Sequence, residues 1–226
     1  MDTVIATPRI ALLAGATGLV GRALLGLLLA SEHYRSVHVL LRCRPPDIES
    51  NAKLTIHEVD FARLPAAFPA VDDVFIALGT TIKIAGSEAG FRRVDFDFVL
   101  NVARAAKSAG ATRLAVVSAM GADPTSRIFY NRVKGEMETA VLQIGYESVV
   151  IAQPSLLLGD RAALGQPPRS SEILAARLLA PLGWIIPRSV RPIPARHVAS
   201  ALVEGILDAK PGVRVLKSGA MQGAAK

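Results

Sequence analysis

The sequence predicts an α/β protein with a doubly wound, mainly parallel sheet and helices on both of its faces. Short apolar runs alternate with longer amphipathic or alanine-rich stretches, which is the pattern of buried strands and their covering helices. The chain has 226 residues, of which 51% are hydrophobic and 20% charged, and its mean hydropathy is +0.37. This composition is sufficient for the core of one large domain, and it excludes disorder over most of the length.

In the first part of the chain, apolar runs bounded by turn residues predict strands, and apolar residues at helical spacing predict a helix. The first run leads into a glycine-rich turn, and the helix after it ends at a polar Ser-Glu-His cluster. The second run precedes a Pro-Pro-Asp turn, the third alternates apolar and polar residues, and the fourth is entirely apolar up to a glycine. The expected strands are Ile10–Ala14, Val37–Leu41, Leu54–Val59 and Val74–Leu78, with a helix at Leu19–Ala30.

In the second part of the chain, Gly110 and Gly145 mark the ends of two helices. Pro, Gly and Arg become denser over residues 154–194, where we expect a variable segment that faces the substrate and contains one helix. A single domain is expected over residues 1–217, followed by a frayed tail over 218–226. The expected helices are Phe91–Ala109, Ile128–Ile144, Ser171–Leu179 and His197–Ala209, and the expected strands are Leu114–Val117, Val149–Ala152 and Val213–Leu216.

Composition and charge argue against several classes of protein. No stretch reaches the roughly 18 uncharged apolar residues of a membrane span, and residues 1–8 lack the basic start and apolar core of a secretory signal. Cys43 is the single cysteine and has no metal-ligand neighbour, so we expect no internal disulfide and no metal site. The net charge is +7, but the basic residues are scattered and aromatic residues are only 5%. We therefore expect a cytoplasmic monomer or homodimer without a membrane or nucleic-acid partner.

A glycine-rich turn stands between the first strand and its helix. Glycines at such a turn allow a tight bend, let backbone N–H groups approach a pyrophosphate, and let helix and strand pack closely. Packing glycines without a ligand are the alternative, but the position within a βαβ order favours a dinucleotide site. A protein kinase loop is excluded because the chain has no His-Arg-Asp or Asp-Phe-Gly motif. The turn consists of Gly15, Ala16, Thr17, Gly18, Leu19, Val20 and Gly21.

Residues after the next strands predict which dinucleotide is bound. The second strand is followed by Arg42, where an acid would bind the ribose hydroxyls of NAD. A guanidinium pairs with a 2′-phosphate, so Arg42, with Arg44 beside it, favours NADP(H); a solvated surface arginine is the alternative. Asp60 follows the third strand, where the adenine edge would lie. The fourth strand ends where the chain would pass the pyrophosphate and ribose, at Leu78, Gly79, Thr80 and Thr81. Asp60, Gly79, Thr80 and Thr81 could each equally serve a turn.

Three side chains suited to carbonyl reduction follow in the next part of the sequence. Tyr130 and Lys134 are four residues apart and share one helix face, and Ser118 ends the fifth strand at the carboxyl edge of the sheet. A nearby ammonium lowers the pKa of a phenol, a tyrosine can protonate a carbonyl that receives hydride, and a serine can hydrogen-bond that oxygen. A surface Tyr–Lys pair beside a strand-end serine is the alternative.

On these motifs the sequence resembles the short-chain dehydrogenase/reductase superfamily, and most of all its atypical branch of NAD(P)H-binding proteins similar to the Tat-interacting-protein oxidoreductases. The resemblance implies a Rossmann fold, NADP(H), Ser118 as the carbonyl orienter, Tyr130 as acid/base, and Lys134 touching both the ribose and the phenol. Asn101 lies on the long helix, and its correspondence to the asparagine that completes a proton relay in other branches is left open. The segment Gln153-Pro154-Ser155 is similar to the one that borders the nicotinamide in members of the family. In those members an arginine more often precedes the proline, whereas this chain has Gln153. Further matching segments are Ala77–Thr81, Val94–Asp97, Val117–Asp123 and Tyr130–Glu136.

The expected function is that of an NADP(H)-dependent oxidoreductase, which transfers hydride between the nicotinamide and a small carbonyl or alcohol substrate. A non-catalytic, redox-sensing NADP(H)-binding protein on the same fold is the alternative. The complete Ser, Tyr and Lys set favours the enzyme, because a sensor needs the glycine turn and not a proton donor.

Overall fold

Each apolar run that predicts a strand of the central sheet forms one in the computed structural model, which describes residues 7–45, 48–65, 68–159, 187, 189–208 and 210–223. The second strand begins earlier than expected, at the buried Tyr34, because its pairing with the first strand continues to that residue. The strands of this sheet are β1 (Arg9–Ala14), β2 (Tyr34–Leu41), β3 (Leu54–Glu58), β4 (Asp73–Ile76), β5 (Arg113–Val117), β6 (Ser148–Gln153) and β9 (Gly212–Lys217).

The helices depart further from the sequence-based expectation. Helix α1 (Leu19–Ala30) has the expected bounds, whereas α5 (Phe129–Leu142) and α7 (Ala195–Leu207) differ at their ends. In place of one long helix at Phe91–Ala109, the chain forms α3 (Glu88–Arg92), the π-helical segment η1 (Arg93–Asp97) and α4 (Phe98–Ser108). The helix expected at Ser171–Leu179 lies outside the described residues. Elements not expected from the sequence are α2 (Ile82–Ala85), β7 (Leu157–Leu158), β8 (Ile193–Pro194) and α8 (Ser218–Met221).

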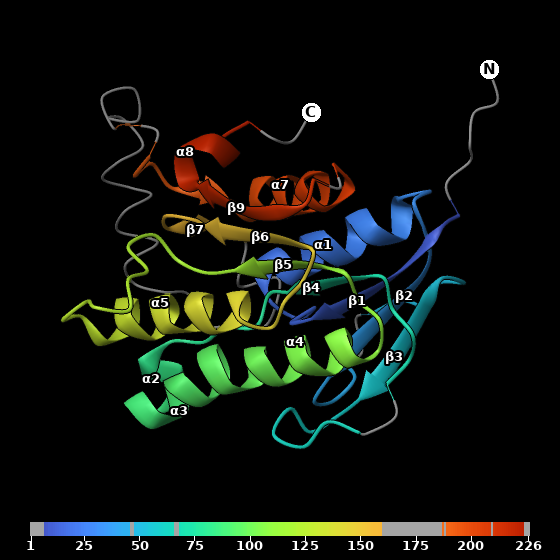
Figure 1. Cartoon of the computed structure of the whole chain (residues 1–226), viewed down its shortest axis with the longest axis horizontal. Helices are drawn as coiled ribbons and strands as arrows, with labels where there is room; N and C mark the ends of the chain where they lie inside the picture. Colours follow the sequence, from blue (N-terminus) through green and yellow to red (C-terminus); the bar gives the residue numbers. More distant parts are fainter. Residues whose placement is uncertain are drawn as a thin grey trace.

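The sheet has the order β3-β2-β1-β4-β5-β6-β9, and all neighbouring strands are parallel (Figure 1). Helices α1 and α7 cover one face, and α4 and α5 cover the other (Figure 1). The strand order reverses between β1 and β4, which is where a doubly wound sheet opens a crevice at its carboxyl edge. This confirms the predicted Rossmann fold, and the glycine turn follows β1 at this switch point.

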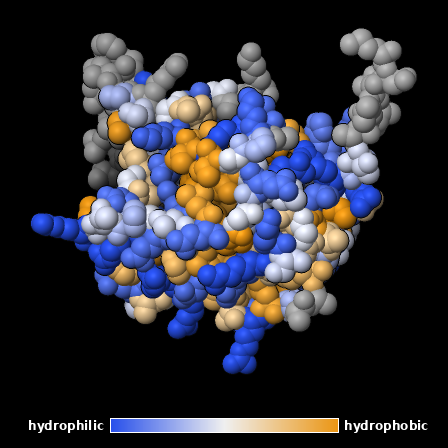
Figure 2. Space-filling model, in the orientation of Figure 1, coloured by the Kyte–Doolittle hydropathy of each residue, from blue (hydrophilic) through white to orange (hydrophobic). Residues whose placement is uncertain are grey.

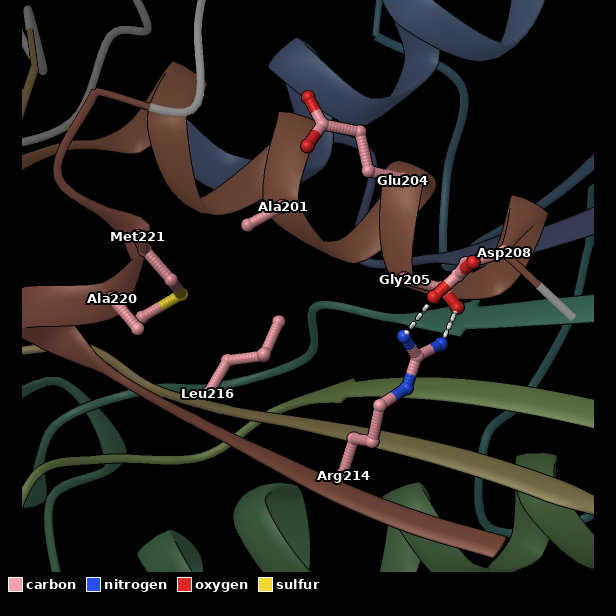
Figure 3. Close-up of a pocket in the computed structure, with 8 residues that line it drawn as sticks. All are labelled: Ala201, Glu204, Gly205, Asp208, Arg214, Leu216, Ala220 and Met221. Carbon is pink, nitrogen blue, oxygen red and sulfur yellow. Dashed lines mark hydrogen bonds and ion pairs between the residues drawn. The ribbon is translucent and has the colours of Figure 1, made fainter. Parts of the chain in front are cut away.

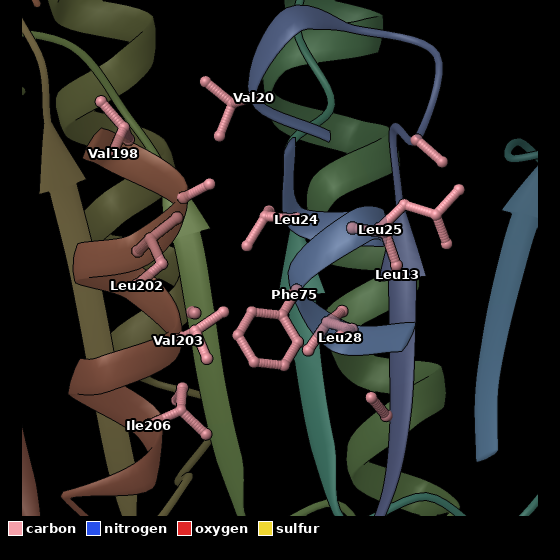
Figure 4. Packing of buried hydrophobic residues seen from close by; sticks show 14 of the residues in the cluster. Leu13, Val20, Leu24, Leu25, Leu28, Phe75, Val198, Leu202, Val203 and Ile206 are labelled. Carbon is pink, nitrogen blue, oxygen red and sulfur yellow. The ribbon is translucent and has the colours of Figure 1, made fainter. Parts of the chain in front are cut away.

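Two apolar layers hold the sheet between its helices. On one face, α1 and α7 lie side by side, and Phe75 of β4 fills the space between Leu28 of α1 and Val203 of α7 (Figure 4). The central strands are buried on both faces, which explains why they are continuously apolar rather than alternating. The edge strand β9 differs, because its Val213 and Val215 are exposed, and hydrophobic residues gather on the surface over β6 and β9 (Figure 2).

The end of the chain corrects the expectation of a frayed tail from residue 218 onward. Residues 218–221 form helix α8, in which Met221 is fully buried. The Oγ atoms of Ser218 and Ser155 lie 2.8 Å apart in the interior. Small residues dominate this segment of the sequence. Its packing depends on Met221 and Ser218, and two such residues do not form a pattern that predicts a buried helix.

Two partly buried histidines lie side by side on neighbouring strands. The Nδ1 atom of His38 on β2 lies 2.8 Å from Nε2 of His57 on β3. Burial lowers the pKa of both rings, and the neighbouring His57 lowers the pKa of His38 further. Because the pKa of histidine is about 6.5 in the unfolded chain, the unfolded state binds more protons once the pH falls below that value.

We therefore expect the free energy of unfolding to be highest above about pH 6.5 and to decrease as the pH falls below it. In His57→Gln, which removes one titrating ring and keeps hydrogen-bonding groups, this decrease should be smaller than in the parent protein. Urea unfolding between pH 5 and pH 8 measures it. An identical pH dependence in the variant and the parent would contradict the role assigned to the pair.

Candidate functional site

The segments singled out in the sequence meet at the carboxyl edge of the sheet. The glycine turn follows β1, residues 78–81 follow β4, and Ser118 follows β5. Helices α2 and α3 and the first turns of α5, which carry Tyr130 and Lys134, gather at the same edge (Figure 1). The parallel topology therefore brings together groups that are far apart along the chain.

Two glycines of the turn are required by the packing of the turn itself. Gly15 has a φ of +93°, and a Cβ there would lie 2.5 Å from the backbone carbonyl of Ala77, just beyond β4. A Cβ at Gly21 would lie 1.9 Å from the carbonyl oxygen of Gly15. Any side chain at either position would displace backbone, so these glycines let β1, α1 and the end of β4 approach closely.

Gly18 differs from these two glycines, because a Cβ at this position would not clash with the backbone. A Cβ there would meet nothing closer than the carbonyl oxygen of Gly15 at 3.6 Å, which is an ordinary contact. Gly18 is the N-cap of α1, where no side chain caps the helix and no acid occupies the first turn. The uncapped N–H groups and the positive end of the helix dipole suit an anion, and the missing side chain leaves room for it. This local geometry fits the pyrophosphate of a dinucleotide.

Ser118 is buried at the end of β5, with 4% of its surface exposed. Its backbone N–H donates to the carbonyl of Ala152 on β6, but its Oγ has no hydrogen-bond partner within the described part of the chain. Buried hydroxyls are nearly always hydrogen-bonded in folded proteins. Since the described residues offer this hydroxyl no partner, it retains the capacity to hydrogen-bond a polar atom of a ligand bound at this edge.

Tyr130 and Lys134 lie on successive turns of α5. The ring of Tyr130 packs 5.2 Å from that of Phe91 on α3, measured between centroids. The Nζ of Lys134 lies 2.7 Å from Oδ1 of Asp95, and both side chains are buried. Burial alone would lower the pKa of Lys134, but the carboxylate of Asp95, together with Tyr130 and Glu138, outweighs burial and raises it. The lysine is therefore held as a cation.

Asp95 is the site residue that sequence reasoning missed. Its Oδ2 accepts a hydrogen bond from the backbone N–H of Thr80 at 2.8 Å, while Oδ1 pairs with Lys134. A signal was present in the sequence, since Phe91, Asp95 and Val99 recur at four-residue spacing and so share one buried helix face. An acid within such an apolar stripe needs a buried partner.

Several predicted site residues have side chains engaged in local structure. Asp60 accepts a hydrogen bond from the N–H of Ala62, and Thr81 caps α2 by accepting one from Ile84. Ser155 donates its hydroxyl to the carbonyl of Arg191. The turn roles kept open as alternatives for Asp60 and Thr81 are thus present, and the hydroxyl of Ser155 is committed elsewhere.

The remaining predicted residues divide between the surface and the interior. Arg42 is exposed after β2, and Pro154 is buried after β6, where its carbonyl accepts the N–H of Met120. Gln153 donates to both carboxylate oxygens of Glu138 at 3.1 Å. Asn101 donates to the carbonyl of Phe61, which ties α4 to the loop after β3. The side-chain amide of Asn101 is therefore engaged with Phe61 and not with Ser118, Tyr130 or Lys134.

A separate cavity of about 330 Å³ lies between α7, β9 and α8 (Figure 3). Its basic side chain, Arg214, pairs with Asp208 at 2.8 Å and also donates to the carbonyl of Gly205. No residue of the glycine turn, and none of Ser118, Tyr130 and Lys134, lines it. Its walls are formed by Ala201, Glu204, Gly205, Asp208, Arg214, Leu216, Ala220 and Met221.

Comparison with known proteins agrees with this geometry. Residues 15–149 match the family model described as NAD(P)H-binding. Over 152 residues, the chain is 37% identical to "Protein FMP52, mitochondrial" of Eremothecium gossypii, a match that covers 67% of each protein. Over 180 residues, it is 34% identical to "Protein fmp52, mitochondrial" of Emericella nidulans, covering 76% of each.

Solved structures share the fold at low sequence identity. MoeE5 in complex with UDP-glucuronic acid and NAD superposes with a TM-score of 0.70 at 21% identity, covering 92% of this chain and 76% of that one. The Bordetella bronchiseptica enzyme WbmG in complex with NAD gives 0.68 at 18% identity, covering 96% and 75%. At this level of identity, the likeness establishes the fold.

The names of the relatives contradict the cytoplasmic location expected from the sequence, since both FMP52 proteins are described as mitochondrial. That expectation relied on the lack of a secretory signal and of a membrane span, and neither feature separates the cytoplasm from the interior of an organelle. Within the described ranges, no helix is both long and apolar enough to cross a bilayer.

Proposed function

The chain belongs to the NAD(P)H-binding family, as an atypical relative of the short-chain dehydrogenases/reductases, and we propose that it is an NADP(H)-dependent oxidoreductase acting on a small carbonyl or alcohol. The observation that carries this proposal is the buried Ser118 hydroxyl, which has no hydrogen-bond partner among the described residues and lies at the edge of the sheet where Tyr130 and Lys134 also lie. A protein that only binds the dinucleotide needs neither such a hydroxyl nor a phenol at this edge of the sheet.

Each residue has a defined task in the proposed reaction. The glycine turn and the first turn of α1 hold the pyrophosphate, Arg42 holds the 2′-phosphate, and Lys134 holds the ribose. The bound cofactor supplies or accepts the hydride. Ser118 donates a hydrogen bond to the substrate oxygen and orients it. Tyr130 gives that oxygen a proton during reduction and takes it back during oxidation.

The proposal is tested by identifying the nucleotide that co-purifies with the protein and then supplying NADPH with a panel of aldehydes, ketones and quinones. Substrate-dependent loss of NADPH absorbance is the expected result. Tight NADPH binding without turnover across a broad panel would contradict the enzyme and indicate the redox sensor.

Arg42→Ala should weaken NADPH binding by roughly tenfold to a hundredfold and leave NADH binding unchanged, because only NADPH carries the 2′-phosphate that the guanidinium would contact. Calorimetric titration with both nucleotides measures the preference. Arg35→Ala is the matched control, since Arg35 is an exposed arginine near the opposite end of the same strand, β2. An unchanged ratio of NADPH to NADH affinity in Arg42→Ala would remove this residue as the phosphate contact.

A further inference from the structure

One carboxylate joins the helix that carries Tyr130 to the turn that follows β4. The Oδ1 atom of Asp95 lies 2.7 Å from the Nζ of Lys134. Its Oδ2 atom accepts a hydrogen bond from the backbone N–H of Thr80 at 2.8 Å. The turn also packs directly on the carboxylate, because a Cβ at Gly79 would lie 3.3 Å from Oδ1. Each oxygen of Asp95 thus serves a different element of the candidate site.

Asp95 lies in an unusual backbone conformation, and its ion pair with Lys134 is shielded from solvent. Asp95 lies within the π-helical segment η1, and such segments are rare and frequently occur at functional sites. The exposed fractions of the Lys134 and Asp95 side chains are 4% and 1%. Surface ion pairs are loosely held and weak, whereas a buried pair is fixed in one geometry and is costly to break from one side.

Few charges act on Lys134 in this environment. Within the described residues, the titratable groups that act on it are the carboxylates of Asp95 from η1 and Glu138 from α5 and the phenol of Tyr130 from α5, and Glu138 also accepts hydrogen bonds from Gln153 of β6. A buried ammonium without a partner tends to lose its proton, because burial disfavours the charged form. Asp95 is the group in direct ion-pair contact with Lys134, and its carboxylate is the strongest influence that offsets burial.

We infer that Asp95 is a positioning residue, which keeps Lys134 charged and fixes the Gly79–Thr80 turn in register with it. The inference rests on the proposed function, in which Lys134 holds the ribose beside Tyr130 and the turn borders the cofactor. The Asp95 side chain thereby holds Lys134 in place near the proposed proton donor, Tyr130, and also holds the backbone of the turn that would bind the cofactor.

The test is Asp95→Asn, which removes the charge but retains an oxygen that can accept the N–H of Thr80. Lys134 should then lose its proton at a lower pH, so NADPH binding should approach that of the parent near pH 6 and be about tenfold weaker near pH 9. In the turnover assay, the alkaline limb of the pH–kcat profile should move to lower pH by about one unit or more. Asp97→Asn makes the same change of charge at an exposed position of η1 and should match the parent.

Binding in Asp95→Asn that equals the parent at every pH, or that is weakened equally at every pH, would overturn the inference, since the carboxylate would then act only in packing. If the parent binds NADPH but turns over no substrate, the proposed function fails, and the binding measurements still decide the inference. If Asp95→Asn does not fold, the inference is tested by the folding of the double variant Asp95→Asn with Lys134→Met. Recovery of folding would support Asp95 as the partner that compensates the buried ammonium, and failure to recover would overturn it.

Discussion

Tyr130→Phe is expected to bind NADPH as the parent does and to reduce a carbonyl substrate about 10²–10⁴-fold more slowly. The change removes one hydroxyl and keeps the ring that packs against Phe91. Hydride delivered to a carbonyl carbon without a proton for the oxygen leaves an alkoxide unneutralised, so the loss should fall on kcat. Steady-state turnover and calorimetric NADPH binding of the same preparation measure both quantities.

The matched control is Tyr146→Phe, which removes a buried hydroxyl that donates to the carbonyl of Ala103, away from the carboxyl edge of the sheet. It should cost roughly 1 kcal/mol or somewhat more in stability and leave turnover unchanged. Ser118→Ala should lower turnover without lowering stability, because the Ser118 hydroxyl has no protein partner to lose within the described residues. Unchanged turnover in Tyr130→Phe would remove Tyr130 as the acid.

Much of the fold follows from local signals, because a doubly wound sheet buries its central strands on both faces. Such strands read as continuous apolar runs, and β1, β4 and β6 were predicted on that basis. The glycine turn was also predictable from the sequence. A Cβ at Gly15 or Gly21 would lie too close to backbone atoms, so these positions require glycine. Both signals come from steric requirements that act within one short segment.

Buried acids were not predictable in the same way. Asp73 begins β4 and is fully buried, where it accepts hydrogen bonds from Tyr34 at 2.7 Å and Arg113 at 2.5 Å and lies 3.3 Å from a guanidinium nitrogen of Arg9. Asp95 likewise takes its partners from distant segments of the chain. The helical spacing around Asp95 indicates that this acid is buried, but local patterns do not identify the distant partners of either acid.

Gly18→Val is expected to abolish dinucleotide binding and leave the protein folded. Gly18 has an extended backbone, with φ −85° and ψ 168°, which a β-branched residue adopts readily. A Cβ there makes only an ordinary contact at 3.6 Å, so the branched side chain is accommodated by the protein and fills the space that the pyrophosphate needs. Calorimetric titration with NADPH, alongside thermal unfolding, measures the two effects separately.

Gly21→Ala provides the contrast within the same turn. Its Cβ would lie 1.9 Å from the carbonyl oxygen of Gly15, so backbone must move, and we expect a loss of stability of about 1–3 kcal/mol or more. Stability should therefore fall in the alanine variant at residue 21 and stay near the parent value in the valine variant at residue 18, although valine is the larger side chain. A folded Gly18→Val protein with undiminished NADPH affinity would show that the open side of the turn does not receive the cofactor, since the valine would then occupy space that the pyrophosphate never enters.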